Sequence, residues 1–273
     1  MLFPENAKVI KILDIGTRFI EDDPPIYYEL IKFNECDILA FDRDESACTS
    51  LLTPETNNTI YIKKAALGSG KKETLHIRAL PSCSSMLEPN FDVLSNYSTL
   101  SHFYEITSKL DIQTEKMDNV CAEFKPQILK IDTQGYELEA LKHSEKTLES
   151  LLAIHIETGF VEKYKNQPLF RYVNLFLNKH GFQFHFFTGY GTRSPKGIMT
   201  NEDPLAGINQ WLWADTVYFK SLNNKIYSDN CKKLIELAKI FHYCHESYDH
   251  AAHCLHLYDK KMELTLQKNI QTT

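Results

Sequence analysis

Short apolar runs alternate with helix-patterned segments between residues 8 and 220. Runs bounded by turn residues predict buried strands, whereas apolar residues at helical spacing predict helices. The predicted main strands cover residues 8–16, 37–44, 59–67, 127–132, 151–157, 182–187 and 215–219. Helices are predicted at 136–149 and 169–179, and a long loop at 188–213. Strands that alternate with helices predict an α/β fold with a mostly parallel seven-stranded sheet and helices on both faces.

Two of these runs end in acidic residues, Asp132 and Glu157. Right-handed crossovers place the carboxyl ends of parallel strands at one edge of the sheet, where ligands bind at the reversal of strand order. Buried parallel strands rarely carry charge, so acids at their ends predict a site there. Strand alternation gives Lys130 the same facing as Asp132, and His155 the same facing as Glu157.

A second candidate site follows the first strand, at Asp14, Ile15 and Gly16. Glycine lets the backbone approach a ligand closely. Asp42 ends the second strand, where an acid commonly bonds the ribose hydroxyls of a nucleoside. The residues after Gly16 are Thr17-Arg18-Phe19, so the glycine fingerprint that holds a pyrophosphate is missing. The pattern suits a nucleoside without phosphates, with S-adenosylmethionine as the leading ligand, or else a turn glycine beside surface acids.

The tail from residue 229 carries a continuous apolar stripe at helical spacing. It predicts one long helix, or two helices broken near Tyr248. The stripe either packs against the main domain or forms a homodimer by coiled-coil-like contact. We therefore divide the chain into a main domain, residues 1–222, and a C-terminal helical extension, residues 223–273.

Composition narrows the function classes. The formal net charge of −6 argues against a broad nucleic-acid footprint. No apolar run is long enough to span a bilayer, and the N-terminus lacks the pattern of a signal peptide. Seven cysteines at irregular spacing suit a reducing cytosol, so a cytoplasmic protein is expected.

The central segment also resembles a known family. Residues 129–137 read Leu-Lys-Ile-Asp-Thr-Gln-Gly-Tyr-Glu, and a leucine-rich helix and a strand ending in Ile156-Glu157 follow. This pattern resembles the FkbM family of methyltransferases, and the likeness covers roughly residues 8–220. Further matches are Phe41-Asp42, Ala66-Leu67-Gly68, Ser84-Ser85, Tyr164, Gly181-Phe182 and residues 215–219.

The resemblance implies a Rossmann-like class I fold that uses S-adenosylmethionine to methylate an oxygen, usually of a sugar or a secondary metabolite. One departure is the Thr17-Arg18-Phe19 turn, where the family usually has Asn and a second Gly. The residues then expected to contact the cofactor are Asp14, Ile15, Gly16, Thr17, Asp42, Arg43, Ala66, Leu67, Ser85 and Asp132.

Methyl transfer to a hydroxyl is an in-line displacement that benefits from a base. Asp132, Glu157 and His155 are the catalytic candidates. Their alternatives are an ion pair of Asp132 with Lys130, a helix or loop cap for Glu157 and a core position for His155. No third oxygen ligand accompanies the two acids in the pattern, so we expect no metal.

The acceptor is expected to be a small molecule or a glycan. Tyr164, Tyr190, Arg193 and Trp211 are the candidate substrate contacts, because aromatic faces and a guanidinium suit a sugar. A lid packed on the core would explain the same loop residues. Other functions stay open: N-methylation of a peptide or amino-sugar, a nicotinamide-dependent oxidoreductase, and a catalytically silent dimeric scaffold.

Overall fold

The computed structural model describes residues 3, 9–16, 24–42, 58–199, 202–203 and 205–271. Its strands are β1 Ile10–Ile15, β2 Cys36–Asp42, β3 Ile60–Lys64, β4 Ala66–Leu67, β5 Lys72–Arg78, β6 Ile106–Glu115, β7 Ile128–Ile131, β8 Ala153–Gly159, β9 Phe182–Thr192 and β10 Trp211–Lys220. Its helices are α1 Tyr28–Lys32, α3 Phe91–Leu94, α4 Leu100–Phe103, α5 Met117–Val120, α6 Glu137–Lys142, α7 Glu145–Ser150, α8 Phe170–Lys179, α9 Lys225–Asp229, α10 Lys232–His245 and α11 Tyr248–Gln271, with a 3-10 turn η1 at Pro81–Cys83.

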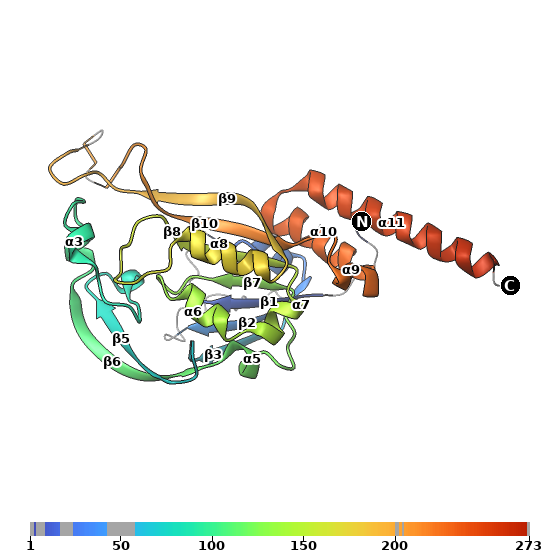
Figure 1. Ribbon diagram of the computed structural model, residues 1–273, viewed down its shortest axis with the longest axis horizontal. Coiled ribbons are helices and arrows are strands. Elements are labelled where there is room, and N and C mark those ends of the chain that lie inside the picture. Colours follow the sequence, from blue (N-terminus) through green and yellow to red (C-terminus); the bar gives the residue numbers. More distant parts are fainter. Residues whose placement is uncertain are drawn as a thin grey trace.

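Seven strands form one sheet in the order β3-β2-β1-β7-β8-β10-β9 (Figure 1). The strands from β3 to β8 pair in parallel, and β10 is antiparallel to both β8 and β9. The chain order reverses between β1 and β7, so a ligand crevice is expected outside the carboxyl ends of these two strands. The mixed α/β architecture and the mostly parallel seven-stranded sheet confirm the predicted Rossmann-like layout.

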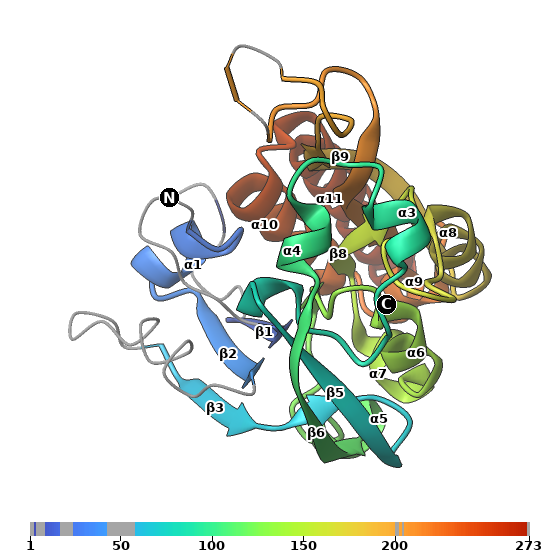
Figure 2. The same ribbon diagram turned by 90° about the vertical axis from the view of Figure 1, so that its left-hand side faces the viewer.

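Strand alternation divides the core in two. Ile10 and Ile12 of β1 share one apolar cluster with buried residues of α1 and α10. Leu13 and Ile15 of the same strand belong to a second cluster, with buried residues of α5, α6, α7 and α8. In Figure 2, α1 and α10 accordingly lie apart from α6, α7 and α8. The near-continuous apolar character of β1 follows from burial on both sides.

A cap is inserted between β4 and β6, and we define it as residues 72–103. It contains β5, η1, α3 and α4, which lie in front of the large sheet in Figure 2. The cap bonds the segment that follows β8, because the Asn90 N–H donates to the Lys163 carbonyl at 3.0 Å and the Lys165 N–H to the Glu88 carbonyl at 2.8 Å. The cap therefore covers the carboxyl ends of the central strands.

Three predicted elements differ from the structure. The single helix expected at 136–149 is wrong, because α6 and α7 are separate helices. Asp118 of α5 caps α7, accepting the N–H groups of Lys146 at 3.1 Å and Thr147 at 2.8 Å. This cap comes from a distant segment, so local periodicity could not reveal the break.

The loop expected at 188–213 is also shorter than predicted. β9 and β10 pair as far as Trp211 and Thr192, with register shifts that interrupt the alternation along the sequence. The third predicted strand, 59–67, divides into β3 and β4, and β4 pairs with β6 instead of the large sheet.

The tail forms two main helices, α10 and α11, with Glu246 between them in a left-handed conformation at φ 51°. Leu234, Leu237 and Phe241 of α10 are buried in the apolar cluster that contains β1. α11 continues away from the body of the molecule (Figure 1). Over the part of the chain that the structure describes, no helix has both the length and the apolar character of a membrane span. The division at residue 222 and dimerisation stay predictions.

Replacing Leu237 by Ala tests whether α10 belongs to the core. Leu237 is fully buried, so Leu237→Ala should lower the free energy of unfolding by about 2–5 kcal/mol. Leu175→Ala on α8 is the control, because that side chain is 55% exposed and the change should cost less than about 0.5 kcal/mol. Urea denaturation measures both, and equal midpoints for the two variants would contradict the packing of α10.

Candidate functional site

Polar character increases toward the carboxyl edge on the α10 side of the sheet. Strand register aligns Asp14 with Lys130, and Lys130 with His155. The next residues toward the edge are Asp132 after β7 and the registered pair Glu157 and Asp215. Along the strands, a row of apolar residues is therefore followed, within a few residues, by a row with mixed charges and then by a row of acids.

Lys130 organises the first of these rows. Its ammonium lies 3.5 Å from Asp14 Oδ1 and donates a hydrogen bond to the Gly16 carbonyl at 2.9 Å. The Tyr27 hydroxyl donates to Asp14 Oδ2 at 2.5 Å. Burial alone would lower the pKa of Lys130, but the carboxylates of Asp14, Asp132 and Asp215 outweigh it and raise that pKa. The charged lysine thereby fixes the turn after β1.

Gly16 brings this turn against the end of β7. Its φ is 76°, and a Cβ there would lie 2.0 Å from the Asp132 carbonyl oxygen. Gly16 also donates its N–H to the Phe41 carbonyl at 2.9 Å, while the Asp132 N–H donates to the Ile15 carbonyl at 3.0 Å. Both the conformation and the space therefore require glycine.

Glu157 and Lys163 form a buried ion pair at the edge. Their side chains are 9% and 2% exposed, and Lys163 Nζ lies 3.3 Å from Glu157 Oε1. Burial raises the pKa of Glu157 to about 8, against the lowering effect of Lys163 and with further raising by Asp132 and Asp215. Although burial lowers the pKa of Lys163, the negative surroundings raise it overall. Burial and the nearby carboxyl groups both favour the protonated form of Glu157, and the same carboxyl groups favour the protonated form of Lys163.

Gln134 connects the two predicted catalytic acids. Its side-chain Nε2 donates to Asp132 Oδ1 at 2.8 Å and to Glu157 Oε2 at 3.3 Å. Its Oε1 accepts the hydroxyl of Tyr164 at 2.9 Å, and its backbone carbonyl accepts the hydroxyl of Ser85 at 2.7 Å. The structure therefore brings Asp132 and Glu157 together through one amide.

Glu137 has a structural role in the same turn. Its carboxylate accepts the backbone N–H groups of Thr133 at 2.8 Å and Gly135 at 3.0 Å. Burial and the nearby Asp132 raise its pKa to about 7, although these N–H groups lower it. The residue shapes the backbone that presents Asp132 and Gln134.

His155 lies in the buried row behind the acids. Its Nε2 is 3.8 Å from Asp215 Oδ1, and its ring is parallel to that of His245, with centroids 6.1 Å apart. Burial, His245 and Lys130 lower the pKa of His155 to about 3. The imidazole is therefore neutral at pH 7, and its core surroundings agree with the alternative reading of a core histidine.

The residues predicted to contact the cofactor lie in several different parts of the fold. Asp42 ends β2 at the carboxyl edge. Leu67 is buried in the core beside α6 to α8, and Ala66 precedes it in β4. Ser85 is buried, donates to Gln134 and accepts the Leu87 N–H at 3.0 Å. Thr17 and Arg43 lie outside the described residues. Contact of these residues with a cofactor stays a prediction.

Two of the predicted substrate residues form an aromatic platform. The rings of Tyr190 and Trp211 stack at a 10° angle with centroids 4.5 Å apart, and the two residues are 60% and 36% exposed. The guanidinium of Arg193 lies over the Trp213 ring, 5.0 Å from its centroid. Tyr164 is fully buried and donates to Gln134, the amide that joins the two acids. Its contact with a substrate stays a prediction.

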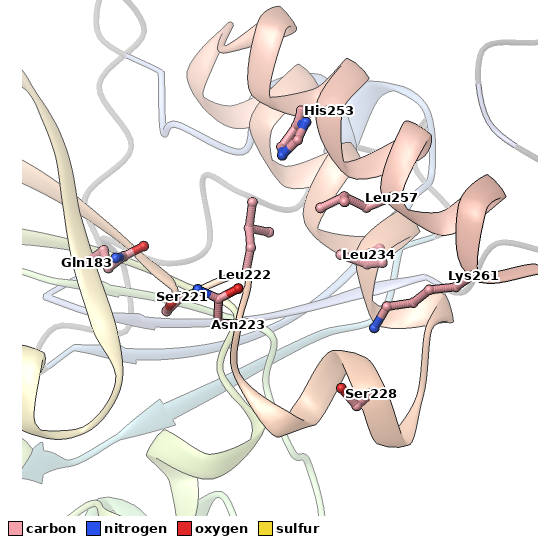
Figure 3. A pocket seen from close by; sticks show the side chains of 9 residues that line it. All are labelled: Gln183, Ser221, Leu222, Asn223, Ser228, Leu234, His253, Leu257 and Lys261. Atoms are coloured by element: carbon pink, nitrogen blue, oxygen red, sulfur yellow. The ribbon is translucent and has the colours of Figure 1, made fainter. Parts of the chain in front are cut away.

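A separate groove of about 590 Å³ lies at the opposite end of the large sheet. Figure 3 shows side chains of α11 facing the chain that follows β10 across this groove. The lining residues are Gln183, Ser221, Leu222, Asn223, Ser228, Leu234, His253, Leu257 and Lys261. The predicted site residues are not among them, so the groove is distinct from the acidic edge. Among the described residues, no cluster of His, Cys, Asp and Glu has the arrangement of a metal site.

Comparison with known proteins assigns the family. The model of the methyltransferase FkbM domain matches residues 14–184, more than half of the chain and all of the acidic edge except Asp215. The chain belongs to this family of methyltransferases, as the sequence pattern predicted. No curated protein matches the sequence.

The structure also adds residues that the sequence did not indicate. Gln134, Lys163 and Tyr27 all contact predicted site residues. The sequence does not indicate that Lys163 contacts Glu157, because the two residues are six positions apart and meet only through a turn of the chain between them. Gln134 stands inside the family-like segment, and its position between two acid-tipped strands was the one available clue.

Substituting Gly16 tests the close contact between the turns. Gly16→Ala should lower the free energy of unfolding by at least about 3 kcal/mol, because the new Cβ meets a backbone oxygen. Gly197→Ala is the matched control: its φ is 82°, but the space around a Cβ is open, so a cost of about 1 kcal/mol is expected. Similar urea midpoints would show that the contact is not tight.

Acid should destabilise the protein through His155 and His245. Burial lowers their pKa values to about 3 and about 4, so the unfolded chain binds protons first as the pH falls below about 6.5. Their contribution to stability is complete above that pH and is lost progressively as the pH falls toward about 3. His245→Phe should reduce the slope of unfolding free energy against pH, whereas His256→Phe on the exposed side of α11 should not. An unchanged slope in His245→Phe would refute this assignment.

Proposed function

We propose that the protein is an S-adenosylmethionine-dependent O-methyltransferase that acts on a hydroxyl of a sugar, a glycan or a glycosylated intermediate. The observation that carries this proposal is the pair Asp132 and Glu157, held by one amide at the edge beside the Gly16 turn. The family assignment supports methyl transfer and favours it over nicotinamide-dependent chemistry. The proposal includes a class I fold with helices on both faces, and a cytoplasmic location.

The chemistry of the edge fits this cofactor. S-adenosylmethionine carries a positive sulfonium, and Asp132, Glu157 and Asp215 provide an excess of carboxyl groups there. The left-handed Gly16 lets the turn after β1 pack against the Asp132 carbonyl, which places that turn beside the acids. Asp42, at the end of the neighbouring strand, would bond the ribose hydroxyls. When bound, the cofactor supplies an activated methyl group.

The residues of the protein must carry out the other steps of the proposed reaction. A hydroxyl acceptor must be held in line with the methyl and lose its proton. Glu157 is suited to receive that proton, because burial brings its pKa to about 8 and both of its forms exist near neutral pH. Asp132 would orient the acceptor or the cofactor, and Lys163 stabilises Glu157 when it is ionised.

The exposed platform of Tyr190 and Trp211 is proposed to hold the acceptor. An aromatic face matches the apolar C–H face of a pyranose, and Arg193 follows on the same segment. The two rings belong to β9 and β10, and their residues lie near the end of β8 that carries Glu157. The Trp211 ring contacts Phe160 and Phe187, and Phe187 packs on Phe170 of α8, so the platform lies on the α8 face of the sheet. A sugar stacked on it would reach the acids of the α10 face around the end of the sheet.

Calorimetry with S-adenosylhomocysteine tests the proposal. The wild-type protein should bind this product, and Asp42→Ala should weaken binding about 10- to 100-fold through loss of a charged hydrogen-bond acceptor. Asp37→Ala is the matched control, because Asp37 is at the amino end of the same strand. Absence of binding to the wild-type protein at high micromolar ligand would reject the cofactor.

A further inference from the structure

We propose that Gln134 is a positioning residue that holds Asp132 and Glu157 as one working pair and ties this pair to the cap. This inference rests on the proposed methyl transfer, in which these two carboxylates serve the acceptor and the cofactor. Gln134 acts through the acids and is not assigned a contact with either ligand.

The side-chain amide has a single orientation that satisfies its neighbours. Its two N–H groups serve Asp132 at 2.8 Å and Glu157 at 3.3 Å, and its oxygen accepts the hydroxyl of Tyr164 at 2.9 Å. Exchanging oxygen and nitrogen would set an acceptor against two carboxylates. The geometry therefore defines Gln134 as a donor to both acids.

The backbone of Gln134 is held as firmly as its side chain. Its φ is 55°, a left-handed conformation that is uncommon for residues other than glycine. Such conformations persist where the surroundings fix them. Here the hydroxyl of Ser85 donates to the Gln134 carbonyl, and Glu137 accepts the N–H groups on either side, at Thr133 and Gly135.

The same contacts join the acids to the cap. The single Tyr164 hydroxyl hydrogen is shared between the Gln134 oxygen at 2.9 Å and the Cys83 carbonyl at 3.0 Å, and a β-bridge joins Ser85 to His76 of β5. Cys83, Ser85 and His76 all belong to the cap, whereas Asp132 and Glu157 belong to the sheet edge. Gln134 is therefore the junction through which the cap fixes the spacing of the two carboxylates.

The amide matters because the acids repel each other. Burial raises the pKa of Glu157, Lys163 lowers it, and Asp132, Glu137 and Asp215 raise it further. A donor shared by two carboxylates favours the ionised form of each. Removing that donor should make Glu157 harder to ionise and should separate it from Asp132.

The test is a carbon-13 NMR titration of side-chain carboxyl groups in the full-length protein. The Glu157 signal is assigned by its loss in Glu157→Gln. In Gln134→Met the titration midpoint of Glu157 should rise by about one pH unit, because one charged hydrogen bond is lost. Gln134→Glu, which adds a third carboxyl group at the same place, should raise the midpoint at least as far.

Gln127→Met is the control, because Gln127 is also a buried amide that donates to a carboxylate, Glu236, at 3.1 Å. That change should leave the Glu157 midpoint in place. An unchanged midpoint in both Gln134 variants, or an equal rise in Gln127→Met, would overturn the role of Gln134. The titration needs no cofactor, so it is independent of S-adenosylhomocysteine binding, whose absence would instead overturn the proposed function.

Discussion

Crowding of negative charge at one edge of the sheet is the constraint on which the site depends. Asp132, Glu157 and Asp215 lie on adjacent segments, and the buried Glu157 cannot be ionised beside the other two without compensation. The ammonium of Lys163 and the amide of Gln134 provide it directly. The three acids still outnumber the one lysine that faces them, and this excess is the basis for the proposed positively charged ligand.

The strand pattern explains why the charge collects there. On the α10 side, an apolar row containing Ile12 and Ile128 is followed by the Asp14, Lys130 and His155 row and then by the acids. The helices α1 and α10 cover the first row, so its side chains pack in the hydrophobic core. The second row fixes the turn after β1 through Lys130, and only the last row reaches the edge. The same strands thus contribute residues to core packing along most of their length and the candidate site residues at their carboxyl ends.

The sequence was sufficient for the architecture and for the position of two acids at the carboxyl edge. Apolar runs identified the strands of the large sheet, and acids at the ends of β7 and β8 located the edge, because parallel strands must end together. It was insufficient where contacts between distant segments determine the local structure. Asp118 divides one predicted helix into two, and Lys163 reaches Glu157 through a turn of the chain. The contacts of Gln134 join three segments that no local pattern relates.

A crystal structure with bound S-adenosylhomocysteine tests the central claim most directly. The account predicts that the sulfur lies at the carboxyl edge, between the Gly16 turn and the acids Asp132 and Glu157, with the ribose near Asp42. A ligand bound elsewhere, such as in the groove between α11 and the chain after β10, would contradict it.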